Sequence, residues 1–375
     1  MIRCIIPPHM FESIAENGSP LQQQSAQSNL VMSAQLREER HEAPGAPRPP
    51  GAAPEGKQRT VYTAGNGTNL PGTRVRGEGE GASGDAAVDE AYDGSGDTYD
   101  LYDQAYGRAS IDGSNGALIS TVHYQVGYDN AFWNGTQMVY GDGDENLPEA
   151  ERLFNRFTKS LDVIGHELTH GVTQHTADLV YLGQPGALNE SFSDVFGVLV
   201  VQRKLNQAAT AADWLVGSEL FTENVAGSGI RSMKAPGTAY DDPVLGKDPQ
   251  PAHMDDYVNT SSDNGGVHIN SGIPNHAFYR AATELGGFAW EQAGTIWYRT
   301  LTDARLTSQA SFQQAASLTF TVAGELFGAG SAQQTAVVNG WNAVGIDPVG
   351  GDDGGPQPSG CLPFARVIGG LVARG

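Results

Sequence analysis

Two histidines four residues apart, His166 and His170, enclose an acidic residue, Glu167. If this stretch is a helix, both imidazoles lie on one face, because residues i and i+4 are neighbours on a helix surface. Such a pair can bind a zinc ion, and Glu167 can act as a base on a water molecule that the ion activates. A buried helix whose histidines are only hydrogen-bonded has the same spacing, so these five residues leave both interpretations open.

A carboxylate further along the chain favours the metal. Glu190 lies in a second stretch with helical periodicity, which follows a Gly/Pro-rich turn at 183–186. An antiparallel pair of helices would return Glu190 to the histidines as a third ligand, and three protein ligands plus one water are typical of a catalytic zinc site. Asp194, one turn later, can accept a hydrogen bond from the outer nitrogen of a ligand histidine and so orient its ring.

The elements that must position these groups are two apolar helices. Ser160 or Thr158 is a candidate N-cap of the first helix. Each helix has one apolar stripe, formed in the first by Leu161, Ile164, Leu168 and Val172, and in the second by Leu188, Phe192, Val195, Phe196 and Leu199.

Around these helices the chain resembles the thermolysin family of zinc metalloproteases. Residues 130–143 and 263–273 are similar to signature blocks of that family, and the similarity extends from about Thr60 to Pro348. Residues 4–10 resemble the compact pro-segment of its protealysin-like branch. The resemblance implies an α+β fold with two lobes, a β-rich N-terminal lobe and a mainly helical C-terminal lobe, with the zinc helix between them.

The resemblance also implies roles for individual residues. One zinc ion would be held by His166, His170 and Glu190, with Glu167 as the base. His268 would be the second catalytic residue, which donates to the oxyanion of the tetrahedral intermediate.

Further residues would support these. Asp263 would keep His268 protonated, because an acidic neighbour raises the pKa of a histidine. Tyr181 matches another oxyanion donor, although by chemistry alone it is equally a packed aromatic residue. Asn189 matches a partner of the second ligand histidine. Three residues match those that hold the substrate backbone in the family: Asn130, Ala131 and Arg231. Four others match the pocket that receives the side chain after the scissile bond: Val163, Val216, Leu220 and Ile230.

Composition and the resemblance together divide the chain. We expect a pro-segment at 1–42, a Pro/Gly-rich linker at 43–59, a β-rich catalytic lobe at 60–178, a helical catalytic lobe at 179–348 and a disordered tail at 349–375. Within the β-rich lobe, alternation predicts a strand from Leu118 to Val126, with His123 on its face rather than at a metal. Residues 130–141 are expected to form another strand.

Charge and cysteine content exclude several classes. The chain of 375 residues carries a formal net charge of −21, which disfavours nucleic acids and anionic membranes. No apolar run is long enough to span a membrane. Only two cysteines occur, Cys4 and Cys361, so a disulfide framework is excluded. We expect protein or peptide substrates and a monomer.

The N-terminal sequence and the family resemblance predict different cellular locations for this protein. Pro7 and Pro8 interrupt the N-terminal stretch before an apolar signal core can form, which by itself predicts synthesis without standard export. The family resemblance implies secretion instead, so both locations stay open.

The function predicted is that of a zinc-dependent neutral endopeptidase that cleaves before bulky hydrophobic residues and is made as a self-processing precursor. One alternative is a related exopeptidase, which would need an acidic anchor for a free amine. Another is a zinc-containing peptide-binding protein without catalysis, which would have no need of Glu167 and His268.

Calcium sites implied by the resemblance are altered here. Asp162 and Asp213 are retained at the double site, but Val201, Leu215 and Ser218 stand where the family has carboxylates. At a further loop site Thr222 remains, whereas Ser228 replaces an acid. Calcium prefers six to eight oxygen ligands, several of them charged, so the double site is predicted to be lost.

We therefore expect the melting temperature to differ little between millimolar calcium and a calcium-selective chelator. An ion that bound the folded state alone would stabilise that state, and the stabilisation would grow with the logarithm of the calcium concentration. Thermal unfolding at several calcium concentrations checks this, and a large upward shift that tracks two bound ions would contradict it.

Overall fold

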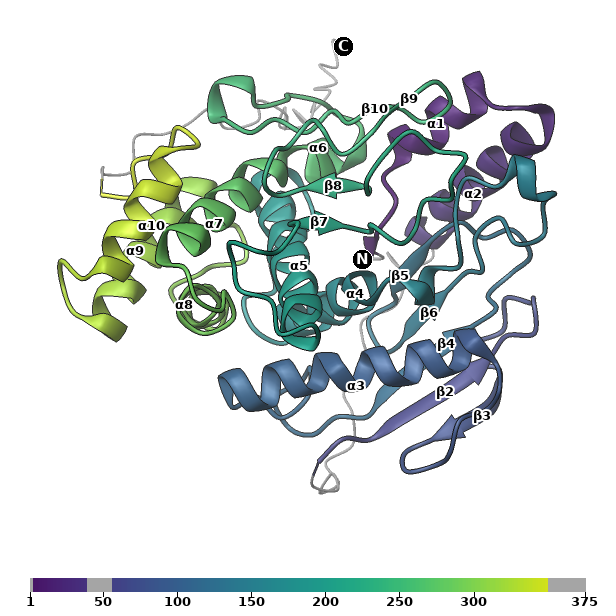
Figure 1. Cartoon of the computed structure of the whole chain (residues 1–375), viewed down its shortest axis with the longest axis horizontal. Coiled ribbons are helices and arrows are strands. Elements are labelled where there is room, and N and C mark those ends of the chain that lie inside the picture. The colour runs from purple at the N-terminus through teal and green to yellow at the C-terminus, as the bar shows by residue number, and fades with distance from the viewer. Residues whose placement is uncertain (1–2, 39–55, 350–375) are drawn as a thin grey trace, which may run out of the picture.

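A six-stranded sheet with the order β1-β5-β6-β4-β2-β3 forms one side of the molecule, and helices form the other (Figure 1). The computed structural model describes residues 3–38 and 56–349. The strands of the sheet are β1 (Arg3–Cys4), β2 (Arg59–Thr63), β3 (Thr73–Gly77), β4 (Leu118–Val122), β5 (Ala131–Trp133) and β6 (Met138–Tyr140). The pairs β2–β4 and β4–β6 are parallel, and the other pairs are antiparallel.

The N-terminal segment completes this sheet. Its strand β1 pairs with β5, so that Arg3 lies opposite Trp133 and Cys4 opposite Phe132. The two helices that follow are α1 (Pro8–Asn17) and α2 (Pro20–Glu38), at the upper right of Figure 1. The expected linker lies largely, and the expected tail almost entirely, outside the described residues.

Three long helices connect the sheet to the helical lobe. They are α3 (Ala86–Tyr106), α4 (Leu161–Gln174) and α5 (Gly183–Lys204). Helix α3 contacts β2 and β4 on one side and α4 and α5 on the other. The predicted zinc helix, α4, thus lies between the two lobes.

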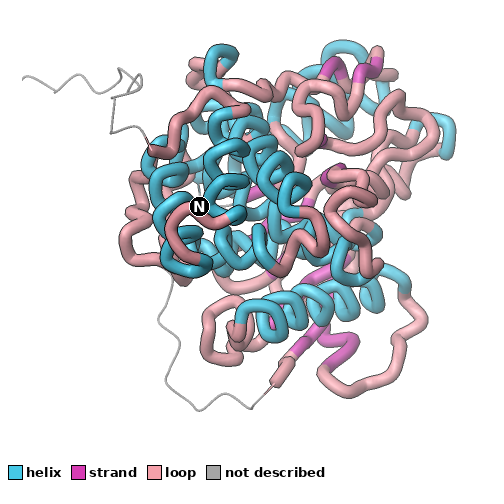
Figure 2. The backbone as a smooth tube through the Cα atoms, turned by 60° about the vertical axis from the view of Figure 1, so that its left-hand side comes forward, coloured by secondary structure: helices cyan, strands magenta, loops and turns pink. Residues whose placement is uncertain are grey.

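Further helices and short strands make up the C-terminal lobe, where the helices lie close together in the tube view (Figure 2). The helices are α6 (Asp263–Asn270), α7 (Gly272–Leu285), α8 (Gln292–Leu301), α9 (Phe312–Phe327) and α10 (Ala332–Asn342). Two-residue strands form two small antiparallel pairs, β7 (Leu215–Val216) with β8 (Arg231–Ser232), and β9 (Asp241–Asp242) with β10 (Gly246–Lys247). No helix in the described ranges is both long and apolar enough to cross a bilayer.

Helices α4 and α5 approach each other closely because glycine occupies both sides of their contact. A Cβ atom on Gly197 would lie 2.5 Å from the carbonyl oxygen of Asp162, and one on Gly165 would lie 3.0 Å from the Cα atom of Gly197. Any larger residue would push the helices apart. The close contact fixes how near a side chain of α5 can come to the histidines of α4.

One buried hydrophobic cluster runs through both lobes and includes the N-terminal segment. Met10, Phe11 and Ile14 of α1 are at most 3 % exposed and belong to this cluster. The N-terminal helix is therefore packed as core, which an arm lying loosely on the surface would not be.

Two predictions about the β-rich lobe were wrong. The strand β4 ends at Val122, because His123 and Gln125 have φ values of 53° and 52°, which extended backbone does not allow. Residues 130–141 form a hairpin of β5 and β6 rather than one strand, because Asn134 Oδ1 accepts hydrogen bonds from the backbone of Thr136 and Gln137 and closes a turn. In addition, residues 183–186, expected to form a turn before the second helix, are the first turn of α5, which begins at Gly183.

Candidate active site and metal centre

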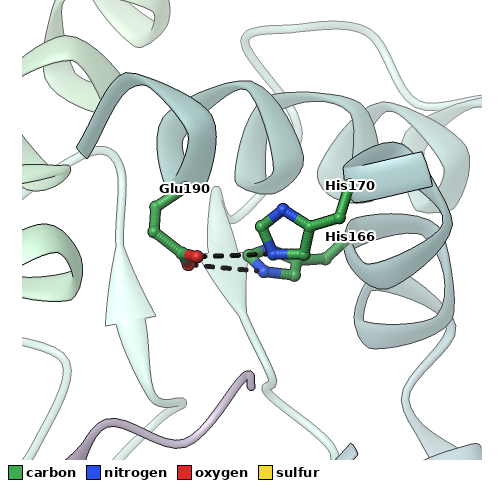
Figure 3. A group of neighbouring side chains, drawn as sticks. All are labelled: His166, His170 and Glu190. Atoms are coloured by element: carbon green, nitrogen blue, oxygen red, sulfur yellow. Dashed lines mark ion pairs between the residues drawn. The ribbon is translucent and has the colours of Figure 1, made fainter. Parts of the chain in front are cut away.

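The side chains of His166, His170 and Glu190 converge between α4 and α5 (Figure 3). His166 Nε2 lies 3.4 Å from Glu190 Oε2, and His170 Nε2 lies 3.3 Å from Glu190 Oε1. All three side chains are fully buried. The antiparallel helix pair thus brings together the three ligands that were predicted from their spacing.

This group fits a zinc ion. His166 Nε2 and Glu190 Oε2 are buried polar atoms that make no hydrogen bond, a costly arrangement unless a cation satisfies them. Two imidazole nitrogens and one carboxylate are a common ligand set for catalytic zinc. Within residues 3–38 and 56–349, no other cluster of three or more histidine, cysteine or acidic ligands is close enough to hold a metal.

Asp194 holds the outer side of His166, as expected. Its Oδ1 atom accepts from His166 Nδ1 at 2.8 Å, which leaves Nε2 to face the metal group. Arg231 donates to both oxygens at 2.7 and 2.8 Å, and Asn275 donates to Oδ2 at 2.8 Å. Burial alone would raise the pKa of Asp194, but the charge of Arg231 and the bond to His166 lower this pKa to about 2.

His170 is held in the same way by α5. Its Nδ1 atom lies 2.9 Å from Asn189 Oδ1 and 2.9 Å from Ser193 Oγ. The amide of Asn189 is oriented because its Nδ2 donates to the carbonyl oxygen of Leu179 at 3.1 Å. The partner role of Asn189 was expected from the resemblance.

Two contributors were missed in the sequence. Ser193 could have been found, because it lies one helical turn from Asn189 on the same face. Asn275 gave no signal, because only the folded chain brings α7 next to Asp194.

Glu167 points toward β5 rather than into the ligand group. The backbone N–H of Trp133 donates to its Oε2 atom at 2.9 Å, while Oε1 is buried and makes no hydrogen bond. Burial raises the pKa of Glu167 to about 8, and the negative charge of Glu190 contributes to this rise. A carboxyl group with such a pKa is suited to accept and release a proton near neutral pH.

His268 is aimed at the site by a sharp turn at the start of α6. Asn264, Gly265 and Gly266 all have positive φ, so the chain reverses and Asp263 can bond to both the backbone N–H of His268, at 2.8 Å, and its Nδ1 atom, at 2.6 Å. Burial acts to lower the pKa of His268, but the charges of Asp263 and Glu190 raise it to about 9. This direction favours the protonated ring, which has an N–H to donate from Nε2.

Tyr181 lies beside these groups. Its hydroxyl donates to Glu190 Oε1 and is 3.2 Å from His268 Nε2. The hydroxyl is thus within the site, although here it bonds to a metal-ligand candidate and not to a carbonyl group.

Asn130, Ala131 and Arg231 all contact the N-terminal segment. The Ile5 backbone N–H donates to the Ala131 carbonyl oxygen at 3.3 Å, and Arg231 Nη1 donates to the Ile5 carbonyl oxygen at 3.1 Å. Asn130 bonds to Ile6 twice, accepting from its N–H at 3.1 Å and donating to its carbonyl oxygen at 3.4 Å. The three residues expected to grip a substrate backbone therefore grip the backbone of this segment.

Polar contacts also attach the helices of this segment. In α2, Ser25 and Asn29 donate to Asp129 Oδ2 at 2.8 and 3.0 Å, and burial raises the pKa of Asp129 well above its usual value. In α1, His9 Nε2 lies 3.0 Å from the hydroxyl of Tyr240, while its Nδ1 is buried and makes no hydrogen bond.

Asp162, one of the two retained calcium positions, is already hydrogen-bonded by the protein. Its Oδ1 accepts from Ser160 Oγ at 2.5 Å and from the Val163 N–H at 3.0 Å, and its Oδ2 accepts from the Gly217 N–H. Asp213 accepts instead from the backbone of Leu215. The loss of the double calcium site stays a prediction.

His123 directly follows the last residue of β4 instead of lying on the face of that strand, and it bridges two acids. Its Nδ1 is 2.8 Å from Asp142 and its Nε2 is 2.9 Å from Asp85, the N-cap of α3. The bond to Asp142 raises the pKa of His123 to about 9 despite partial burial, so the ring is a structural cation.

Comparisons with known proteins agree with this geometry. Residues 52–174 match the profile of the thermolysin metallopeptidase catalytic domain, and residues 177–346 match that of the thermolysin metallopeptidase alpha-helical domain. An extracellular metalloprotease of Pectobacterium carotovorum subsp. carotovorum is 48 % identical over 344 residues, which cover 92 % of this chain and 96 % of that protein. Protease PrtS of a Photorhabdus species is 53 % identical over 290 residues, which cover 77 % of this chain and 76 % of that protein.

A solved structure extends the likeness to the N-terminal segment. The precursor of protealysin, a metalloproteinase from Serratia proteamaculans, superimposes with a TM-score of 0.82 at 49 % identity, over 92 % of this chain and 99 % of that one. The chain described here belongs to the thermolysin family of zinc metalloproteases, and its fold includes a segment equivalent to that found in a protease precursor.

Proposed function

We propose that this protein is the precursor of a neutral zinc endopeptidase in which Glu167 is the proton acceptor and His268 the principal oxyanion donor. One observation carries the proposal: His268, which lies 3.5 Å from the ligand candidate Glu190, bonds to the same peptide backbone that Asn130, Ala131 and Arg231 hold. Glu167 lies on the helix of the two ligand histidines and is bonded by Trp133 of the adjoining strand β5. This arrangement contains each group that peptide hydrolysis requires.

Zinc bound by His166, His170 and Glu190 supplies an activated water and polarises the carbonyl group of the substrate. Glu167, held by the Trp133 N–H, takes a proton from the attacking water and passes it to the amine that leaves. Protonated His268 donates from Nε2 to the oxygen that becomes negative in the transition state. Tyr181 adds a second donor there when its hydroxyl turns from Glu190 to that oxygen.

The preference for bulky apolar residues after the scissile bond is supported by the position of Ile5. This side chain is fully buried in the hydrophobic core, to which Val163, Val216, Leu220 and Ile230 also belong. Its amide and carbonyl bond to Ala131 and Arg231, as those of a residue following a cleaved bond would. Burial of such a side chain contributes roughly 1.5–3 kcal/mol to binding.

Cleavage of internal bonds is supported over the two alternatives. The backbone of the N-terminal segment passes through the site from Arg3 to Ile6, with chain on both sides of the ligand group. An exopeptidase would instead close one side of the site with an anchor for a terminal charge. A peptide-binding protein without catalysis has no use for an acid of raised pKa held beside the ligands.

Residues 1–42 serve as an inhibitory pro-segment, and the mature enzyme acts outside the cell. The first part is supported by the occupation of the site by β1 and Ile5–Ile6, the second by the extracellular proteases among the relatives. Tethering gives such an inhibitor a high effective concentration, which is lost once the linker is cut.

Replacing the base separates metal binding from catalysis. Glu167→Gln should retain about one zinc per chain, because Glu167 is not a ligand, but lower casein hydrolysis by about 10²–10⁴-fold or more, because the proton acceptor is lost. Metal analysis and a casein assay on the same preparation check this. Glu145→Gln, which changes an exposed acid paired with Arg156, is the control and should remain active. Near-normal turnover by Glu167→Gln would refute the assignment.

Self-processing follows if the linker is accessible to the enzyme's own site. Wild type expressed alone should lose roughly its first forty to sixty residues, because proteolysis concentrates in exposed, flexible segments. Glu167→Gln should keep its full length, and a trace of wild type added to it should restore the cut. Intact-mass spectrometry measures all three. If wild type digests casein and yet keeps its full length, the pro-segment is not removed by this activity.

Acid should weaken the attachment of α1 through His9. Burial lowers the pKa of His9 to about 4 in the attached state, and the positive charges of His268 and Arg231 act in the same direction against the attraction of Asp263. The detached ring has its ordinary pKa near 6.5, so attachment is full above that pH and weakens by up to about tenfold per unit as the pH falls toward 4.

The measurement is hydrogen exchange of the α1 amides in the inactive Glu167→Gln precursor, compared with the same precursor carrying His9→Gln. The quantity compared is the protection of the α1 amides from exchange in the His9 protein, divided by that in the His9→Gln protein. Asp129 is present in both proteins, so its effect on attachment cancels in this ratio. The ratio should fall from about pH 7 to about pH 5, because protonation of His9 weakens the attachment. A ratio that does not change with pH would exclude His9 as the group responsible.

A further inference from the structure

The N-terminal segment lies across the candidate site, and the residues expected to hold a substrate backbone bond to it. Strand β1 runs antiparallel to β5, the strand that carries Ala131. Along the segment, the carbonyl oxygen of Cys4 accepts from His268 Nε2 at 2.8 Å, Ile5 is bonded at both its amide and its carbonyl, and Ile6 is bonded twice by Asn130. These contacts occur in unbroken sequence order across one peptide bond, Cys4–Ile5.

This bond is presented to the groups that perform the chemistry. His268 Nε2, which donates to the Cys4 carbonyl oxygen, is also 3.5 Å from the ligand candidate Glu190. Trp133, whose N–H orients Glu167, is the residue opposite Arg3 in the sheet. The oxygen that would become an oxyanion is thus already at its proposed donor.

The flanking side chains also lie as those of a substrate. Ile5 is fully buried on one side of the bond. On the other side, Cys4 packs against the cluster of Tyr124, Tyr128, Phe132 and Val139 and does not belong to the group of metal ligands. A cavity of about 20 Å³, lined in part by Cys4, Tyr181 and His268, lies beside Cys4, and this volume is enough for one water molecule.

We propose that the Cys4–Ile5 peptide bond is a cleavage site of the precursor's own active centre. This inference rests on the proposed function. Water adds to the carbonyl carbon of Cys4, Glu167 carries the proton of that water to the nitrogen of Ile5, and the C–N bond breaks. The products are a carboxylate at Cys4 and an amine at Ile5, so no co-reactant other than water is needed.

Cutting this bond does not by itself release the pro-segment. The part that begins at Ile5 keeps its contacts through α1 and α2, among them Ser13 with the carbonyl oxygen of Val244 and Gln22 with that of Glu151. It therefore remains in place as a bound product. The cut at Cys4–Ile5 is separate from the cut in the linker, and the two can be counted independently.

The test follows the ends of the pro-segment during maturation of wild-type precursor, by mass spectrometry after denaturing quench. We expect a species that begins at Ile5. Its first-order rate constant should not change with precursor concentration, because the cut is intramolecular. In heavy-oxygen water, the peptide that ends at Cys4 should carry the label in its new carboxylate. Glu167→Gln should form neither product.

Two variants at one position sharpen the result. Ile5→Val keeps the amide and an apolar side chain and should still be cut. Ile5→Pro lacks the N–H that bonds to Ala131 and should slow the cut by at least about tenfold, since one lost hydrogen bond of about 1.4 kcal/mol has that effect. Cutting of the linker in trans, by a trace of mature wild-type enzyme, should proceed in both variants.

Separate outcomes identify which idea fails. If casein is digested and the linker is cut, but the released pro-segment always retains an intact Cys4–Ile5 bond, this inference is overturned and the segment is an uncut substrate mimic. An apparent first-order rate constant that rises with precursor concentration would also overturn it, because the cut would then occur between molecules. If no bond is cut and casein stays intact, the proposed function itself has failed.

Discussion

A buried carboxylate, Asp194, ties the parts of this site together. It accepts hydrogen bonds from His166 of α4, from Arg231 of β8 and from Asn275 of α7. An isolated buried charge is costly, but a two-pronged pair with arginine and further hydrogen bonds offset that cost. Because Arg231 also bonds to the backbone of Ile5, the group that orients a metal ligand and the group that holds a peptide share one anchor. A change at Asp194 would therefore affect the orientation of His166, the hold on the Ile5 backbone and the packing of α7 together.

Local spacing was enough to predict that His166, His170 and Glu190 would converge, because helical geometry places the two histidines on one face and an antiparallel partner returns Glu190 to them. The close approach at Gly165 and Gly197, by contrast, becomes meaningful only once the helices are in contact. The alternation from Leu118 to Val126 was a poor guide to the end of the strand, because it reflects only which side chains are apolar. His123 leaves the extended conformation and bonds to Asp85 and Asp142, and neither feature has a local pattern in the sequence. Asn275 acts through a contact between distant helices, for which one sequence has no local pattern.

The N-terminal segment shows how the site is built to receive a peptide. Strand β5, which becomes an edge of the sheet when β1 is removed, supplies the Ala131 carbonyl to the bound segment and the Trp133 amide to Glu167, so one short strand aligns both the peptide and the base. Donors and acceptors that a sheet edge leaves open are in this way used for recognition. Pre-aligned groups of this kind need little rearrangement when the bond reacts, which is the main source of catalytic advantage in electrostatic sites.

The position of the blocking segment in the chain has a consequence for the protein's synthesis. Ile6 contacts Asn130, 124 residues later, and Cys4 contacts His268, 264 residues later. At roughly 5–20 residues per second, the ribosome makes the blocker on the order of tens of seconds before the last catalytic group. When the last residues of the site have been made, the segment that contacts them is therefore already part of the same chain. Under the proposed function, no nascent chain can complete the site before its inhibitory segment has been made.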